Sequence, residues 1–267
     1  MHKSDPVIQK GLENAQATLD WVAAQQLKGK VANILSELVV MGCSAGSVGA
    51  QLWANKILTT LKWKTAGIVP DSYAGIFPPG SMGPLIYNLG FCTSSGLISD
   101  EMMAKCNAQT LDILEVEAEN IKNNPGVPIA FVQSKTDSVQ QSFYVAVGLS
   151  TNTSATITPT AFYNDVNTAF GNYNIQPNFL TYLVDGSQHC FTDTNVFYTA
   201  DGLGPKDDGS AQNQGLMLSE WVGSWPLMAT ESASSLCEGA LTASEGTSGD
   251  NSYCSTLVLP KTFTYNV

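Results

Sequence analysis

Two patterns of apolar residues alternate along this chain. Apolar positions recurring every three or four residues are typical of helices that bury one face, and short apolar runs are typical of strands in a parallel sheet. The helical pattern covers residues 8–27, 45–58, 99–123, 139–149, 159–170 and 216–225, and the strand pattern covers 38–41, 66–71, 128–133 and 179–184. We therefore expect an α/β fold with a mostly parallel central sheet and helices on both faces.

The remaining stretches set the expected domain organisation. Residues 73–96 contain three prolines and five glycines, which predicts a long irregular segment of the kind that builds pocket walls at strand ends. Residues 226–267 are rich in Ser, Thr and Gly. We expect one catalytic domain over residues 1–225 and, over 226–267, an extension that packs on this domain or trails from it.

A Gly-Cys-Ser-Ala-Gly sequence (42–46) joins the first predicted strand to the following helix. This is the G-x-S-x-G pattern of a nucleophile elbow, in which a sharp turn exposes the serine above the sheet. We expect a side chain at Gly42 or Gly46 to collide with the neighbouring strand or helix. Ser44 is the predicted nucleophile, and the backbone N–H of Ala45 is the predicted oxyanion donor at the helix N-terminus.

A serine hydroxyl needs a base, and the base needs an acid that orients it. The chain has two histidines, of which His2 lies at the terminus and His189 directly follows the last predicted strand. His189 is therefore the candidate base. Asp137, just after the third strand, is the favoured acid and Asp71 is the second choice. The aspartates flanking His189 remain open as further alternatives (Asp185 and Asp193).

Composition narrows the possible partners. The 267 residues carry a formal net charge of −11 with only 12 Lys and Arg, which argues against nucleic acid and anionic lipid. No apolar run reaches about 18 residues, so we expect no membrane span. No clustered His/Cys ligand pattern and no nucleotide-binding glycine motif occurs, so we expect neither a metal nor a cofactor. The oligomeric state is open.

Six cysteines favour an oxidising compartment, and the sequon at residues 152–154 is consistent with secretion and glycosylation. Cys92 with Cys106 and Cys237 with Cys254 are candidate local pairs. Six cysteines allow fifteen full pairings, so the connectivity stays open at this point. No signal peptide is visible at the start of the chain.

Four segments in the same order resemble motifs of the pectin acetylesterase family, which includes the Notum carboxylesterases. Residues 42–46 resemble its Gly-Cys-Ser-Ala-Gly-Gly elbow, and residues 71–77 (Asp-Ser-Tyr-Ala-Gly-Ile-Phe) its Asp-x-Gly-Phe-Phe stretch. Residues 136–140 (Thr-Asp-Ser-Val-Gln) resemble Tyr-Asp-Ser-Trp-Gln, and 188–190 (Gln-His-Cys) resemble Thr-His-Cys. The resemblance implies an α/β-hydrolase fold with Ser44, Asp137 and His189 as catalytic triad.

This chain departs from the family pattern in three places. Ser47 and Val139 replace the last elbow glycine and the tryptophan after the aspartate. The Gly-rich strand and loop that the family places upstream of the elbow have no counterpart here, so we expect an N-terminally incomplete domain with an open sheet edge.

The resemblance implies a secreted serine carboxylesterase that removes O-acetyl groups from a carbohydrate without metal or cofactor. Two alternatives stay open within the family: a Notum-like lipid deacylase, and an inactive member that binds a glycan or a protein. A third reading treats the elbow as a coincidence in a structural domain.

Overall fold

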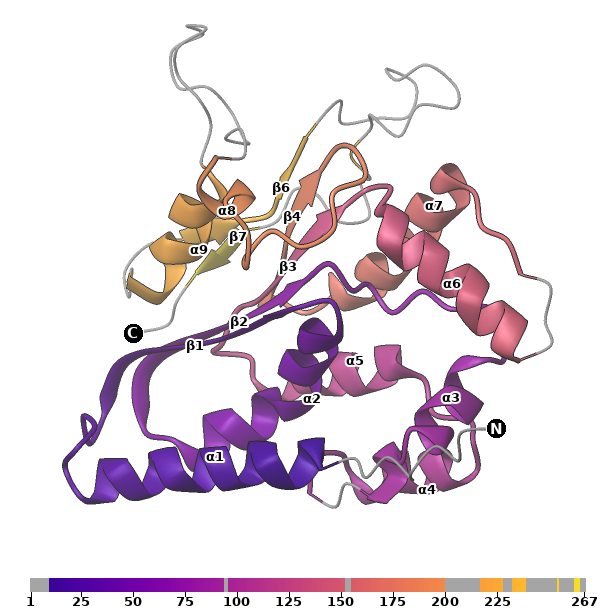
Figure 1. Ribbon diagram of the computed structural model, residues 1–267. Helices are drawn as coiled ribbons and strands as arrows, with labels where there is room; N and C mark the ends of the chain where they lie inside the picture. Colours follow the sequence, from indigo (N-terminus) through magenta and orange to yellow (C-terminus); the bar gives the residue numbers. More distant parts are fainter. Residues whose placement is uncertain are drawn as a thin grey trace, which may run out of the picture.

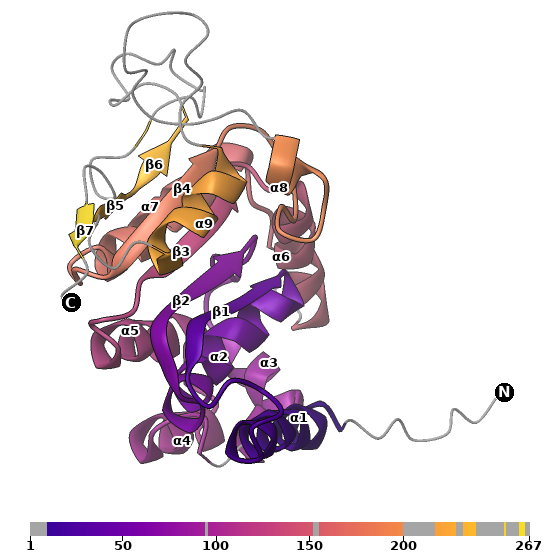
Figure 2. The ribbon, with the colours of Figure 1, turned by 90° about the vertical axis from the view of Figure 1, so that its left-hand side faces the viewer.

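The computed structural model describes residues 10–93, 96–151, 155–199, 217–227, 232–238, 254 and 262–264. A five-stranded parallel sheet with the strand order β1-β2-β3-β4-β6 forms its centre (Figures 1 and 2). These strands are β1 (Leu35–Cys43), β2 (Trp63–Asp71), β3 (Ile129–Ser134), β4 (Phe179–Val184) and β6 (Leu236–Cys237). The α/β fold with a parallel sheet is therefore confirmed. Two further short strands, β5 (Ser232–Ser234) and β7 (Thr262–Thr264), pair antiparallel.

The helices mostly follow the predicted pattern. They are α1 (Gly11–Leu27), α2 (Ala45–Thr60), α3 (Met82–Asn88), the 3₁₀ helix η1 (Phe91–Thr93), α4 (Asp100–Asn107), α5 (Ile113–Asn123), α6 (Ser138–Ser150), α7 (Pro159–Tyr173), α8 (Val196–Thr199) and α9 (Leu218–Leu227). Residues 73–96 contain α3 and η1, so the expectation of an irregular segment was wrong in part.

One helix expected over residues 99–123 is two helices in the structure. The chain turns at Gln109, whose φ of +59° ends α4. The Asp112 carboxylate then accepts a hydrogen bond from the Leu114 N–H and caps α5. Both helices bury apolar residues in the same cluster. The helical spacing of apolar residues therefore continues through the turn, and the sequence pattern does not reveal where one helix ends and the next begins.

Helices cover both faces of the sheet, as expected. Alternate strand residues point to opposite faces: Ile129 and Phe131 pack with α2, α5 and α7, whereas Ala130 and Val132 pack with α9. Figure 1 shows α9 on one side of the sheet and α2 with α5 on the other. Strands β1 to β4 lie side by side in the sheet in the same order as in the chain. Because connections between parallel strands are right-handed, the helices that connect these strands lie on one face of the sheet.

Strand β1, which precedes the elbow, is an edge strand within the described sheet. It hydrogen-bonds to β2 alone among the described strands. Met41 on this strand is 44% exposed.

Several expectations fall outside the described residues: His2, the start of the first helix, the sequon at 152–154 and most of 226–267. The described parts of 226–267 pack against the domain, since β6 pairs with β4 and Phe263 joins the core around Trp221. In the described part of the chain, no helix combines the length and the apolar character needed to span a membrane.

Candidate active site

The three predicted triad residues lie at the carboxyl ends of three strands. Ser44 follows β1, Asp137 lies three residues after β3, and His189 lies five residues after β4. Parallel strands place all these ends at one edge of the sheet, where α/β proteins bind their ligands. The Ser44 N–H also donates to the Asp71 carbonyl at the end of β2 (3.0 Å), which joins the elbow to the neighbouring strand.

The elbow holds Ser44 in a backbone conformation that side chains rarely adopt, with φ +56° and ψ −119°. Gly42 permits the turn, because a Cβ there would lie 2.2 Å from the Gly46 carbonyl oxygen. The expectation for Gly46 was wrong: a Cβ at that position meets no atom within 4 Å. Gly46 lies on the outward side of α2, where a methyl group has room.

Asp137 and His189, the predicted acid and base, are in hydrogen-bond contact. The Asp137 Oδ2 and His189 Nδ1 atoms are 2.8 Å apart, the Asp137 side chain is fully buried, and the imidazole is 15% exposed. Asp137 also caps α6, because its Oδ1 accepts hydrogen bonds from the Val139 and Gln140 N–H groups (3.0 and 2.9 Å). These donors stabilise the carboxylate as an acceptor. The pairing leaves His189 Nε2 available on the opposite side of the ring.

Gln140 orients this pair, a role that the sequence analysis missed. Its Nε2 donates to Asp137 Oδ2 (2.8 Å) and to Gln133 Oε1 (3.0 Å), while its Oε1 accepts from the Ala74 N–H (2.9 Å). Gln140 therefore connects the carboxylate to β3 and to the segment after β2. The sequence did contain a signal for this contact. Gln140 lies three residues after Asp137, in the first turn of the helix that Asp137 caps, and its side chain is therefore close to the Asp137 carboxylate.

The other candidate acids have different partners. Asp185 pairs with the buried ammonium of Lys135 (2.5 Å), and Asp193 is exposed. Asp71, the second choice, is fully buried and holds the chain after His189 in place. Its Oδ2 accepts from the Phe191 N–H and from both the N–H and the hydroxyl of Thr192 (2.8, 2.7 and 2.8 Å).

A second contact joins the end of β2 to the histidine loop. The Asp71 Oδ1 accepts from the Ser72 hydroxyl (2.7 Å), whose oxygen in turn accepts from the Cys190 N–H (2.9 Å). Ser44, Ser72 and Cys190 account for three of the four non-glycine residues with positive φ in the described chain. Backbone strain is thus concentrated at this site, a distribution typical of functional sites.

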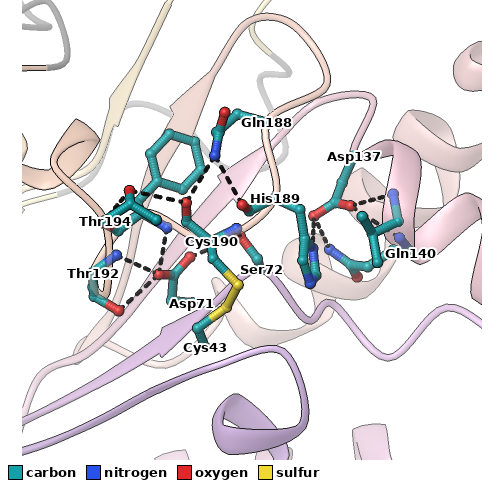
Figure 3. Close-up of a disulfide and its surroundings, with 12 residues drawn as sticks. Cys43, Asp71, Ser72, Asp137, Gln140, Gln188, His189, Cys190, Thr192 and Thr194 are labelled. Atoms are coloured by element: carbon teal, nitrogen blue, oxygen red, sulfur yellow. Dashed lines mark hydrogen bonds and ion pairs between the residues drawn. A yellow bond between two sulfur atoms is a disulfide. The ribbon is translucent and has the colours of Figure 1, made fainter.

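Three disulfides join all six cysteines. The two candidate local pairs, Cys92–Cys106 and Cys237–Cys254, are present. The third, Cys43–Cys190, spans 147 residues and links the residue before Ser44 to the residue after His189 (Figure 3). The sequence contained a signal for it, because each cysteine is next to a predicted triad residue.

Ser44, Ala45 and His189 line a cavity of about 310 Å³. Its walls come from α2, the segment after β2, α3, the start of α5, and α6, and they are mainly apolar. Apolar and aromatic wall residues include Val48, Tyr73, Phe77, Leu85, Ile113 and Phe143. Burial, reinforced by the negative charge of Asp112, raises the pKa of Tyr73 and keeps its hydroxyl neutral.

Ser44 and His189 line the same cavity without a side-chain hydrogen bond to each other among the described contacts. Catalytic contacts of this kind are often long without substrate and tighten when it binds. The Ala45 N–H belongs to the first turn of α2 and has no partner within the helix. It is therefore a donor at the N-terminus of α2, directly after Ser44.

The site includes one group of potential metal ligands within the described residues: Cys43, His189 and Cys190, whose ligand atoms lie within 4.8 Å of one another. The two sulfur atoms are bonded to each other, so neither is a thiolate. His189 Nδ1 is already paired with Asp137. The oxidised site consequently lacks the ligands that zinc requires.

Comparison with protein-family models, curated proteins and solved structures gave no match to this chain. The resemblance to pectin acetylesterases therefore rests on the four short motifs.

Proposed function

We propose that this protein is a serine carboxylic-ester hydrolase that acts through an acyl-enzyme. Ser44 is the nucleophile, His189 the general base and acid, Asp137 its orienting carboxylate, and the Ala45 N–H an oxyanion donor. The observation that carries the proposal is the 2.8 Å contact between Asp137 and His189, together with the cavity that His189 and Ser44 both line.

The reaction has two steps. His189 Nε2 takes the Ser44 proton as Oγ attacks the ester carbonyl, and the Ala45 N–H stabilises the resulting oxyanion. The imidazolium, stabilised by Asp137, then gives its proton to the leaving alcohol and the acyl-enzyme forms. In the second step His189 deprotonates a water that attacks the acyl carbonyl, and the imidazolium then returns this proton to Ser44 Oγ as the carboxylic acid leaves.

The cavity bears on which acyl group is removed. The motif resemblance favours O-acetyl groups on a carbohydrate, but an acetyl group has two carbons and no apolar tail. An apolar wall around the nucleophile is better suited to a longer hydrocarbon chain, because each buried CH₂ contributes about 0.8 kcal/mol. The lining residues thus favour the second candidate function, a lipid-type deacylase, over acetyl removal.

The three disulfides support placing this activity in an oxidising, extracellular compartment. The net charge of −11 supports a neutral substrate over an anionic polymer or nucleic acid.

Labelling with a fluorophosphonate probe tests the proposal, with mass spectrometry to locate the adduct. We expect one adduct on Ser44 in the native protein and none in Ser44→Ala. The labelling rate of His189→Ala and Asp137→Asn should fall by roughly 10²–10⁴, because an unoriented or absent base does not activate the hydroxyl.

Ser142→Ala is the matched control, since Ser142 is an exposed serine on α6, and it should label like the native protein. A folded native protein that forms no adduct would instead support the inactive, ligand-binding alternative.

A further inference from the structure

We infer that Lys135 is a positioning residue for the proposed ester hydrolysis. Its buried ammonium holds the loop that carries Asp137 against the loop that carries His189, and so fixes the contact between acid and base. The inference rests on the proposed function and adds to it a residue that lies outside the lining of the Ser44 cavity.

The acid loop (residues 135–138) and the base loop (residues 185–190) follow two neighbouring strands, β3 and β4. Three backbone hydrogen bonds join the acid loop to the end of β4 and to the base loop: Lys135 N–H to the Val184 carbonyl, Thr136 N–H to Gly186 and Ser138 N–H to Ser187 (2.9, 3.1 and 3.3 Å). The hydroxyls of Thr136 and Ser138 donate to the same two loop carbonyls (2.7 and 3.3 Å). The two loops therefore form one unit, and His189 follows two residues after the last of these contacts.

The Lys135 side chain is fully buried at this unit. Its ammonium forms an ion pair with Asp185 Oδ1 in the base loop (2.5 Å) and donates a hydrogen bond to the Glu238 carbonyl. It also lies 5.6 Å from the centre of the Tyr163 ring on α7, within the range of a cation–π contact. A buried ammonium is stable only where such partners replace the lost water. These partners leave the ammonium little freedom to move.

Glu238 connects the base loop to the C-terminal segment. It directly follows β6, and its N–H donates to the Leu183 carbonyl on β4 (2.9 Å). Its Oε2 accepts from the Asp185 N–H (2.7 Å). The preceding residue, Cys237, is bonded to Cys254. Lys135 is therefore the point at which the acid loop, the base loop and the segment after β6 meet.

The charge on Lys135 restricts the loops more than an apolar side chain of the same size would. A buried ammonium that loses its carboxylate is strongly unfavourable, which selects the one loop arrangement that keeps Lys135 and Asp185 paired. Lys135 lies two residues before Asp137, and Asp185 lies four residues before His189. The restriction consequently acts on both sides of the acid–base contact.

The test compares Lys135→Met, which keeps the length of the side chain and removes the ammonium, with the native protein. The first readout is the exchange rate of the His189 ring N–H proton by NMR, which does not require esterase activity. The chain has only one other histidine, His2, so the signal is readily assigned. We expect exchange to be at least tenfold faster in Lys135→Met, because the proton between Nδ1 and Asp137 Oδ2 is held less firmly.

The second readout is the hydrolysis of p-nitrophenyl butyrate. We expect kcat to fall roughly tenfold or more in Lys135→Met while KM stays within about twofold, because a displaced base slows the chemical step and leaves the cavity intact. Asp185→Asn removes the other charge of the pair from a side chain that is 36% exposed. It should change both readouts in the same direction, and it decides the test if Lys135→Met does not fold.

Lys105→Met is the matched control. It removes an ammonium that pairs with Glu115 (3.0 Å), from a partly exposed lysine on α4 that does not line the cavity, so it should keep the native exchange rate and kcat. Folded Lys135→Met and Asp185→Asn proteins with the native exchange rate and kcat would overturn the inference, even if their stability is lower. A native protein without esterase activity would overturn the proposed function, whereas the exchange rates would still report whether Lys135 positions His189.

Discussion

Cys43 and Cys190 are bonded to each other, so the residue before the proposed nucleophile is covalently linked to the residue after the proposed base. The elbow and the histidine loop come from the two ends of the sheet segment β1 to β4. The disulfide therefore limits how far Ser44 and His189 can move apart. Asp71 reinforces the link through its hydrogen bonds to the same loop.

Removing this disulfide should impair both stability and the rate of Ser44 labelling. For Cys43→Ser with Cys190→Ser, we expect a loss of about 2–5 kcal/mol in the free energy of unfolding and at least tenfold slower labelling. The matched control is Cys92→Ser with Cys106→Ser, which removes a bridge of sequence separation 14 instead of 147. Its labelling rate should change less than threefold, and equal slowing in both double variants would contradict the positioning role of Cys43–Cys190.

Asp71 should matter for positioning although it does not contact His189. Asp71→Asn weakens the acceptor for the Phe191 and Thr192 donors, and hydrogen bonds to a charged group contribute about 1.5–3 kcal/mol each. We expect kcat for ester hydrolysis to fall at least tenfold while KM changes little.

Asp193→Asn controls for the loss of one negative charge in the same loop, because Asp193 is exposed. It should change stability by less than about 0.5 kcal/mol. If Asp71→Asn lowers stability without changing kcat, its role is structural only.

Glu117 should make stability fall as pH rises. Its carboxylate is fully buried and has no cationic partner among the described ion pairs, and this burial, offset in part by the neighbouring Asn120 amide, raises its pKa from 4.5 to about 8. Between these values the unfolded chain loses the proton that the folded protein retains. The free energy of unfolding is therefore not reduced by Glu117 below pH 4.5, and it falls as the pH rises from 4.5 to about 8.

Urea unfolding between pH 4 and 9 measures this effect. We expect Glu117→Gln to be more stable than the native protein by a few kcal/mol at pH 8 and equal to it at pH 4. Glu37→Gln removes an exposed carboxylate from β1 and should keep the native pH dependence. A native-like slope in Glu117→Gln would show that Glu117 is not the responsible group.

The two glycines of the elbow should respond in opposite directions. Gly42→Ala places a Cβ against the Gly46 carbonyl, so we expect a loss of more than about 2 kcal/mol and no labelling of Ser44. Gly46→Ala adds a methyl group in open space on a helix, so we expect a gain of up to about 1 kcal/mol with labelling retained. Thermal unfolding and probe labelling check both. Equal losses in the two variants would mean that the elbow is tighter than its geometry indicates.

The sequence alone determined the α/β fold and the elements around the site. Strand β4 has the bounds expected from its apolar run, and α2 begins at Ala45 as predicted. These features are local, because the period of apolar residues and the turn residues of the elbow act over a few positions. The same local signals placed Ser44, Asp137 and His189 just after strand ends.

Only the tertiary structure decided which acid pairs with His189, which cysteine faces Cys43, and what surrounds Ser44. Asp71 and Asp137 both lie at or just after the end of a strand. Asp137 contacts His189 and Asp71 contacts the Phe191 N–H, and both partners lie more than fifty residues further along the chain. The cavity likewise combines α2, α3, α5 and α6, whose side chains meet only once the sheet has formed. Contacts between distant segments depend on how the whole chain packs. The local pattern of apolar and polar residues does not specify that packing.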